Sequence, residues 1–138
     1  VICEYLDQLN TGTKLFPVDT DARFKALTLA AAGDGMTDAG ILFLIETVRR
    51  PEELRWDWWI ERQQAAMFRC MDVADAAADS MGTDGDITIG EISIACGLGW
   101  IDLRFPDMGW RTDRPALADW FEKISNRPSF ESTMPPQS

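Results

Sequence analysis

The sequence predicts an all-α fold, a helical bundle built around one buried central helix at about residues 89–104. Three observations lead to this prediction. No stretch of useful length alternates between apolar and polar residues as a half-buried strand does. Apolar residues recur instead at helical spacing, in segments bounded by glycine and proline. One of these segments is apolar nearly all round, as expected for a helix at the centre of a domain.

The first predicted helix covers residues 1–9 and ends at Asn10-Thr11-Gly12. One of its sides is apolar and carries Ile2, Tyr5, Leu6 and Leu9. Residues 10–18 then form an extended linker, in which Leu15 and Phe16 are apolar anchors. Because Val1 opens directly into a helical pattern, we expect this chain to be a piece of a longer protein.

A long second helix is predicted from about Asp19, where acidic and hydroxyl residues suit a helix N-terminus, to about Arg50, where Pro51 stops it. Three glycines interrupt it, at 33, 35 and 40, each at a cost of about 1 kcal/mol relative to alanine. Either the helix kinks there, most readily at Gly33-Asp34-Gly35, or another segment approaches its backbone closely. Near its end, Glu46 is spaced to form surface ion pairs with Arg49 and Arg50.

The third predicted helix runs from about Trp56 to Met81 and has one clear apolar face. That face comprises Ile60, Met67, Cys70, Met71, Ala74, Ala77, Ala78 and Met81. At its start the spacing of Trp56, Trp58 and Trp59 is not helical, so we expect at least one exposed ring. A local cluster that stabilises the turn after Pro51 is the favoured interpretation, and packing against another domain or a partner is the alternative.

The central helix carries a strong start signal. Thr88 with Glu91 three residues on forms a capping box, and Ile87 with Ile92 suits a hydrophobic staple. A further helix opens near Pro115, buries one side, and ends at Asn126-Arg127-Pro128, before one last short turn.

Composition excludes several functions. The chain has 138 residues, no histidine, and a formal charge of −10 from 13 Lys+Arg against 23 Asp+Glu. Without histidine there is no imidazole for general-base catalysis or for a zinc site, so we expect no catalytic triad and no histidine-bound zinc. Asp84-Gly85-Asp86 lacks the spaced ligands and final Glu of a calcium loop, so we expect no metal. The net acidity argues against nucleic acid and against an anionic membrane surface, and no apolar run reaches membrane-spanning length. Three scattered cysteines, Cys3, Cys70 and Cys96, fall on apolar faces and predict buried, reduced thiols in a cytoplasmic protein.

The order of these elements resembles the C-terminal helical domain of soluble, bacterial-type glutathione transferases. Gly90 and Glu91 stand where that family usually has Ala and Asp, but glutamate can still serve as the capping carboxylate. The resemblance covers essentially the whole chain and rests on Ile2–Asp7, Phe16-Pro17, Ile87–Ser93, Leu98-Gly99-Trp100, Pro115–Phe121 and Arg127–Phe130.

The resemblance implies a division of the chain. Residues 1–9 would be the last helix of an otherwise missing thioredoxin-like domain, 10–18 the linker, and 19–138 the helical domain. Glutathione would be the co-substrate, held mainly by the missing domain, which also supplies the Ser, Cys or Tyr that activates its thiol. No catalytic residue is therefore expected in this chain, and the isolated chain is expected to be inactive.

The resemblance also implies an electrophile pocket between the long second helix and the central helix, and a homodimer. Asp34 and Asp38, one turn apart, could meet the amino group of glutathione; solvated helix acids are the alternative. Trp100 and Met36 could line the pocket or belong to the core. The parent reaction would be glutathione conjugation to a small electrophile or glutathione-dependent thiol exchange.

Two other classes of function stay open. The same helical domain occurs as a non-catalytic protein-interaction module in translation factors and aminoacyl-tRNA synthetase assemblies. A free-standing helical protein that dimerises through exposed surface is the third interpretation.

Overall fold

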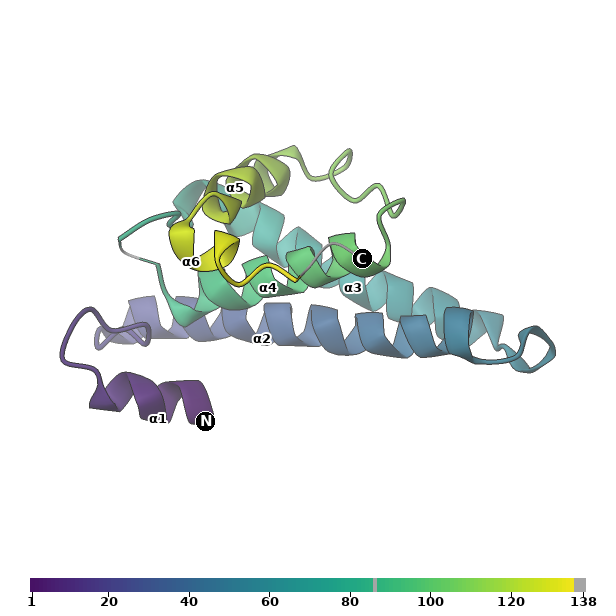
Figure 1. The fold of residues 1–138 in the computed structure, drawn as a ribbon, viewed down its shortest axis with the longest axis horizontal. Helices are drawn as coiled ribbons and strands as arrows, with labels where there is room; N and C mark the ends of the chain where they lie inside the picture. Colours follow the sequence, from purple (N-terminus) through teal and green to yellow (C-terminus); the bar gives the residue numbers. More distant parts are fainter. Residues whose placement is uncertain (86, 136–138) are drawn as a thin grey trace.

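A computed structural model describes residues 1–85 and 87–135, and within these all regular structure is helical (Figure 1). The α-helices are α1 (Ile2–Leu9), α2 (Thr20–Leu44), α3 (Asp57–Ala77), α4 (Ile89–Arg104), α5 (Pro115–Ser125) and α6 (Pro128–Glu131). A π-helical turn, Ile45–Arg49, extends α2, and short 3₁₀ turns occupy Glu52–Leu54 and Ala78–Ser80. The predicted all-α fold and the predicted positions of the helices are confirmed.

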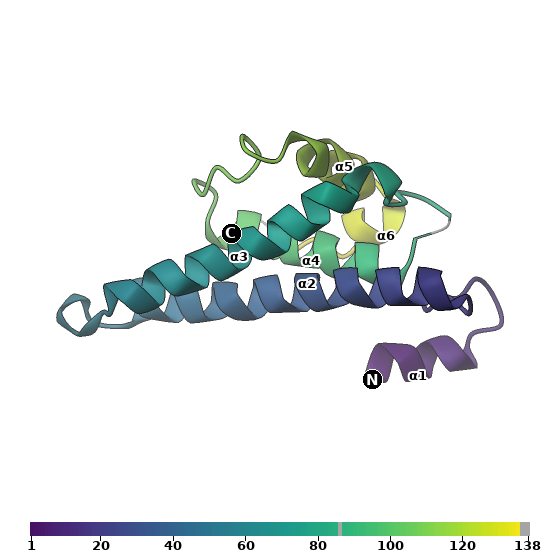
Figure 2. The same cartoon turned by 180° about the vertical axis from the view of Figure 1, so that it is seen from behind.

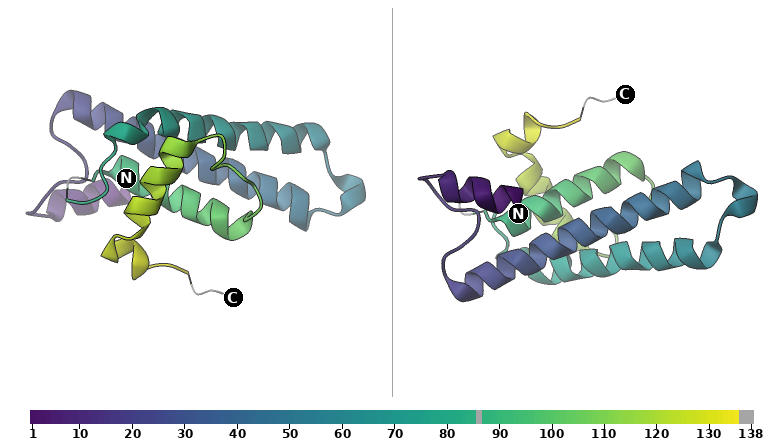
Figure 3. Two further views of the ribbon diagram at one scale, coloured as in Figure 1. Left: turned by 90° about the horizontal axis from the view of Figure 1, so that it is seen from above. Right: turned by 90° about the horizontal axis from the view of Figure 1, so that it is seen from below.

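Helices α2 and α3 form a long antiparallel hairpin, and α4 packs along α2 (Figures 1 and 2). Helix α5 crosses over α3 and α4, with α6 after it, and α1 lies apart beneath the first half of α2 (Figures 1 and 3). The core fills the space between α2, α3, α4 and α5. Its largest fully buried side chains are Met36, Met67, Met71, Ile94, Leu98, Ile101, Leu117 and Ile124.

The glycines of α2 do not kink the helix, which runs straight through them (Figure 1). The kink predicted at Gly33-Asp34-Gly35 was wrong, and the alternative, a close backbone approach, is correct. A Cβ atom on Gly33 would lie 2.5 Å from the carbonyl carbon of Ser93, and one on Gly40 would lie 2.6 Å from Trp100. These glycines let α4 lie directly on α2.

The expectation that no apolar run reaches membrane-spanning length was also wrong. Judged by length and composition alone, one helix of the described residues is long and apolar enough to span a membrane. An 18-residue window within the 30-residue helical segment Thr20–Arg49 has a mean hydropathy of 1.3. A core helix passes the same test, and α2 packs its buried residues against α3 and α4.

Candidate functional site

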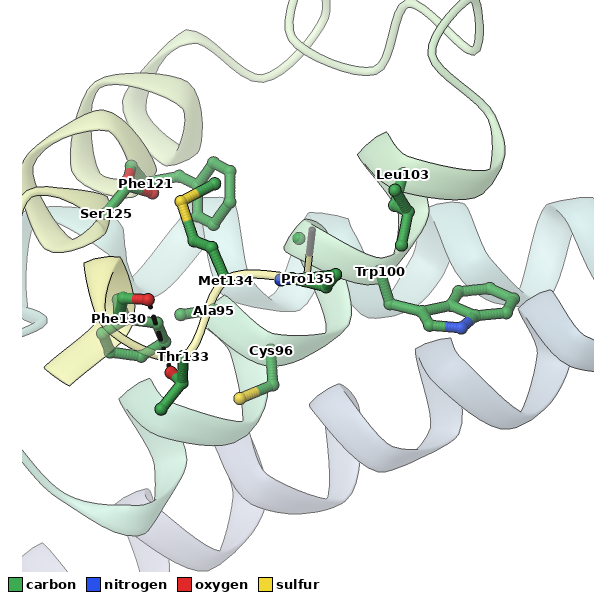
Figure 4. A pocket seen from close by; sticks show the side chains of 11 residues that line it. Ala95, Cys96, Trp100, Leu103, Phe121, Ser125, Phe130, Thr133, Met134 and Pro135 are labelled. Carbon is green, nitrogen blue, oxygen red and sulfur yellow. Dashed lines mark hydrogen bonds between the residues drawn. The ribbon is translucent and has the colours of Figure 1, made fainter. Parts of the chain in front are cut away.

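A pocket of about 300 Å³ opens between α4, α5, α6 and the segment that follows α6 (Figure 4). It forms because α4 is apolar on the side that faces away from α2 as well as on the side packed against it. Its walls consist of Ala95, Cys96, Gly99, Trp100, Leu103, Phe121, Ser125, Phe130, Thr133, Met134 and Pro135.

Among residues 1–85 and 87–135, no charged side chain lines this pocket. Its two hydroxyl groups already donate to backbone carbonyls, Ser125 Oγ to Phe121 at 2.6 Å and Thr133 Oγ1 to Ser129 at 2.7 Å. Cys96 is exposed as a residue, but partial desolvation of its sulfur raises the pKa of the thiol, which keeps it protonated and a poor nucleophile at neutral pH. The described lining of the pocket can therefore hold an apolar, uncharged group.

Trp100 reaches this pocket from the C-terminal half of α4. Its ring packs against α2 at Gly40 and makes an edge contact with Phe105, with ring centroids 5.8 Å apart. It is half-buried, with one part in the packing between the helices and another part at the pocket wall. This pocket lies on the side of α4 away from α2, and not between α2 and α4 where the electrophile pocket is expected. The contact of Trp100 with Gly40 agrees with the packing alternative, and its role at an electrophile pocket stays a prediction.

The other predicted site residues lie on α2 and do not line the pocket. Asp34 and Asp38 are exposed, and among the ion pairs of the described residues neither one takes part. Met36 is 0% exposed and touches Gly97, so it occupies the core, in agreement with the packing alternative. Within residues 1–85 and 87–135, no group of three or more Cys, Asp or Glu side chains could hold a metal ion.

The capping box at the start of α4 is confirmed. Thr88 Oγ1 accepts from the Gly90 amide at 3.1 Å, and Glu91 accepts from the Thr88 amide at 2.9 Å. Glu91 also accepts from the Gly82 amide at 3.3 Å, which ties the loop after α3 to this helix.

The predicted burial of all three cysteines was wrong for two of them. Cys3 and Cys96 are exposed, and Cys70 is half-buried. Cys3 is exposed because no described segment covers the apolar side of α1, and Cys96 because it lies at the open pocket. Burial raises the pKa of the Cys70 thiol, although nearby Arg69 opposes this shift.

The three tryptophans form the predicted local cluster at the tip of the hairpin. The ring centroids of Trp56 and Trp58 lie 4.9 Å apart, and the Arg62 guanidinium lies 5.9 Å from the ring centroids of both Trp58 and Trp59. Trp56 and Trp58 are 59% and 54% exposed, so the prediction of an exposed ring is confirmed.

Glu46 supports this tip, and the prediction of a surface pair was wrong for this residue. It is only 4% exposed, pairs with Arg50 at 2.9 Å, and accepts from the Trp56 amide at 2.9 Å. No Arg49 partner appears among the ion pairs of the described residues. Glu46 is buried because the chain turns back over it after Pro51.

Sequence reasoning missed a second buried carboxylate, that of Asp7 on α1. It is 4% exposed and accepts from the amides of Leu15 and Phe16, at 2.9 and 3.2 Å. No local pattern marks this residue, because its partners lie in the linker and are brought to it only by the turn of the chain.

Comparison with known proteins gives a consistent result. Residues 59–123 match the family model described as the glutathione S-transferase C-terminal domain. The whole chain is similar to the uncharacterized GST-like protein YibF of Escherichia coli K12, with 29% identity over 139 residues and 68% of that protein covered.

Two solved structures are similar to this chain over almost its full length. A glutathione transferase family member from Pseudomonas fluorescens Pf-5, with bound S-(propanoic acid)-glutathione, is 42% identical with a TM-score of 0.91; the match covers 99% of this chain and 70% of that one. A glutathione S-transferase from Methylobacillus flagellatus KT, with glutathione bound, is 30% identical with a TM-score of 0.89, covering 99% and 68%.

Proposed function

Because this chain belongs to the glutathione S-transferase family and has its C-terminal helical domain, we propose that it forms the helical part of a glutathione-dependent transferase. The reaction proposed for the parent protein is attack of the glutathione thiolate on a small electrophile, or thiol exchange if the activating residue is a cysteine. One observation carries this proposal: the 42% identical relative from Pseudomonas fluorescens Pf-5, similar over 99% of this chain, binds a glutathione conjugate.

The proposal divides the chain as the resemblance implies. Residues 1–9 close a preceding thioredoxin-like domain that activates the thiol, 10–18 are the linker, and 19–138 are the helical domain. The exposure of α1 supports this division, because its four large apolar side chains, Ile2, Tyr5, Leu6 and Leu9, are 57–76% exposed. An apolar helix face of this kind is suited to packing against another domain.

Asp34, Asp38 and Trp100 are the residues proposed to serve the site. The two exposed carboxylates of α2 would receive the amino group of glutathione, and Trp100 would form part of the electrophile pocket. The uncharged lining of the pocket beside Trp100, on the side of α4 away from α2, supports an apolar ligand at this helix. Met36 would act only by filling the core beneath these residues.

Titration of this chain with glutathione tests the proposal. We expect backbone amide NMR shifts at residues 34–38 and a shift of the Trp100 indole signal. These shifts should weaken in Asp34→Asn and Asp38→Asn and persist in the matched control Asp79→Asn, in the 3₁₀ turn that follows α3. Absence of shifts in the unmodified chain would remove the proposed contacts.

A rate assay tests where the thiol is activated. With glutathione and an aromatic electrophile, this chain should give no conjugation above the uncatalysed rate. A measurable rate would contradict the proposal that the activating residue belongs to the preceding domain.

We also propose a homodimer and a cytoplasmic location, the latter supported by three cysteines with no disulfide among the described residues. The alternative function, a protein-interaction module, is favoured by the exposed aromatic tip of the hairpin. Light scattering after size exclusion measures the molar mass and so distinguishes the two functions. A transferase domain should remain a dimer in purified protein, whereas an interaction module should be monomeric without its partner.

A further inference from the structure

Asp7 connects three segments that are separate in sequence. Its carboxylate holds the amides of Leu15 and Phe16 through different oxygens, Oδ1 at 2.9 Å and Oδ2 at 3.2 Å. The carbonyl of the same Leu15 accepts from the amide of Ile89, at 2.9 Å. Since Ile89 is the first residue of α4, a short chain of hydrogen bonds runs from α1 through the linker to the central helix.

This connection matters because hydrophobic packing does little to hold α1. The large apolar side chains of α1 are mostly exposed, whereas Asp7 is 4% exposed. A second polar contact, the ion pair of Glu4 with Arg23 on α2, lies on a half-exposed surface and contributes little by itself. Hydrogen bonds to a buried charged group stabilise a fold more than an exposed ion pair does, so Asp7 is the stronger of these two contacts.

We propose that Asp7 is a positioning residue, which fixes the orientation of α1 relative to α4. The functional part of this inference rests on the proposed function. If α1 closes the thiol-activating domain, Asp7 sets the angle between that domain and the wall of the pocket on α4. Misplacement of a reacting group by about 1 Å can reduce a rate by about 100-fold.

Two exposed cysteines offer attachment sites for spin labels, which allow a direct test. Cys3 on α1 and Cys96 on α4 are both exposed, so nitroxide spin labels on them, in a Cys70→Ser background, report the distance between the two helices by pulsed electron resonance. We expect a single narrow distance distribution for the unmodified Asp7. Asp7→Asn should broaden it at least about twofold, because the amide nitrogen of asparagine cannot accept a hydrogen bond. Asp119→Asn on α5, the charge-matched control, should leave it narrow.

Either an unchanged distribution in Asp7→Asn or equal broadening in Asp119→Asn would overturn the inference. If Asp7→Asn also lowers helix content by circular dichroism, Asp7→Glu decides, since glutamate keeps both acceptor oxygens. A narrow distribution then supports positioning by the carboxylate, and a broad one overturns it. The distance measurement needs no enzymatic activity. Its result therefore tests the position of α1 even if the proposed function is wrong.

In the parent protein the same substitution should separate two kinetic constants. Asp7→Asn should lower kcat for conjugation about 10-fold or more and change the KM for glutathione less than about twofold, because glutathione is held mainly by the preceding domain. A fall in both constants together, or no fall in kcat, would contradict a positioning role.

Discussion

Gly33 of α2 lies directly against Ser93 of α4, so close that a Cβ atom at position 33 would be 2.5 Å from the Ser93 carbonyl carbon and 2.6 Å from its oxygen. Both neighbours are backbone atoms, which cannot move aside as a flexible side chain can. The contact therefore sets the distance between the two helices that carry the proposed site residues.

We predict that Gly33→Ala destabilises the protein by about 1–3 kcal/mol, because the helices must separate and the core loses packing. The higher helix propensity of alanine, worth about 1 kcal/mol, offsets only part of this cost. Urea unfolding followed by circular dichroism measures the change in the free energy of unfolding.

Gly35→Ala is the matched control. A Cβ atom there would lie 3.6 Å from the Cys70 sulfur, an ordinary van der Waals contact. We expect Gly35→Ala to stabilise the protein by up to about 1 kcal/mol. If both variants shift the urea midpoint equally, close backbone approach is not what requires glycine at position 33.

The contrast between these two glycines also shows how far the sequence predicts the structure. Helices and caps were predictable because periodic apolar residues and the Thr88–Glu91 pair act within a few positions along the chain. The burial of Glu46 was not, since it depends on Trp56 returning to the carboxylate after a turn. The exposure of Cys96 likewise depends on α5 and α6, which leave a pocket beside α4 instead of filling it.

We also predict that loss of the Thr88–Glu91 capping box destabilises the protein. Thr88→Ala removes the acceptor for the Gly90 amide and should cost about 1 kcal/mol of stability. Glu91→Ala should cost more, about 1–3 kcal/mol, because it leaves the Thr88 and Gly82 amides without their carboxylate partner. The exposed Thr112 serves as control, and Thr112→Ala should change the urea midpoint little. Equal effects of Glu91→Ala and Thr112→Ala would contradict the role of the capping box.

At the hairpin tip, Glu46→Ala should destabilise the fold by about 1–3 kcal/mol, since the Trp56 amide and the Arg50 guanidinium both lose a buried acceptor. We expect the tryptophan emission to shift to the red as the cluster loosens. Glu53→Ala, in the exposed 3₁₀ turn nearby, is the control and should alter neither quantity. A normal emission spectrum in Glu46→Ala would mean that the rings hold one another without this carboxylate.

The pH dependence of thiol reactivity tests the environment of the pocket. Partial desolvation of the sulfur raises the pKa of the exposed Cys96 thiol, so a smaller fraction is thiolate at pH 8 than in a free thiol. In a Cys3→Ser, Cys70→Ser variant, the rate of reaction with a disulfide reagent should rise with pH to a midpoint above that of free glutathione. The folded pKa lies above the unfolded value of about 8.5, so the folded state holds this proton more tightly than the unfolded state does. The free energy of unfolding is therefore highest below that pH and falls as pH rises through the folded pKa. A midpoint at or below that of glutathione would show that the pocket does not desolvate this sulfur, and so is open to water where an apolar group is proposed to bind.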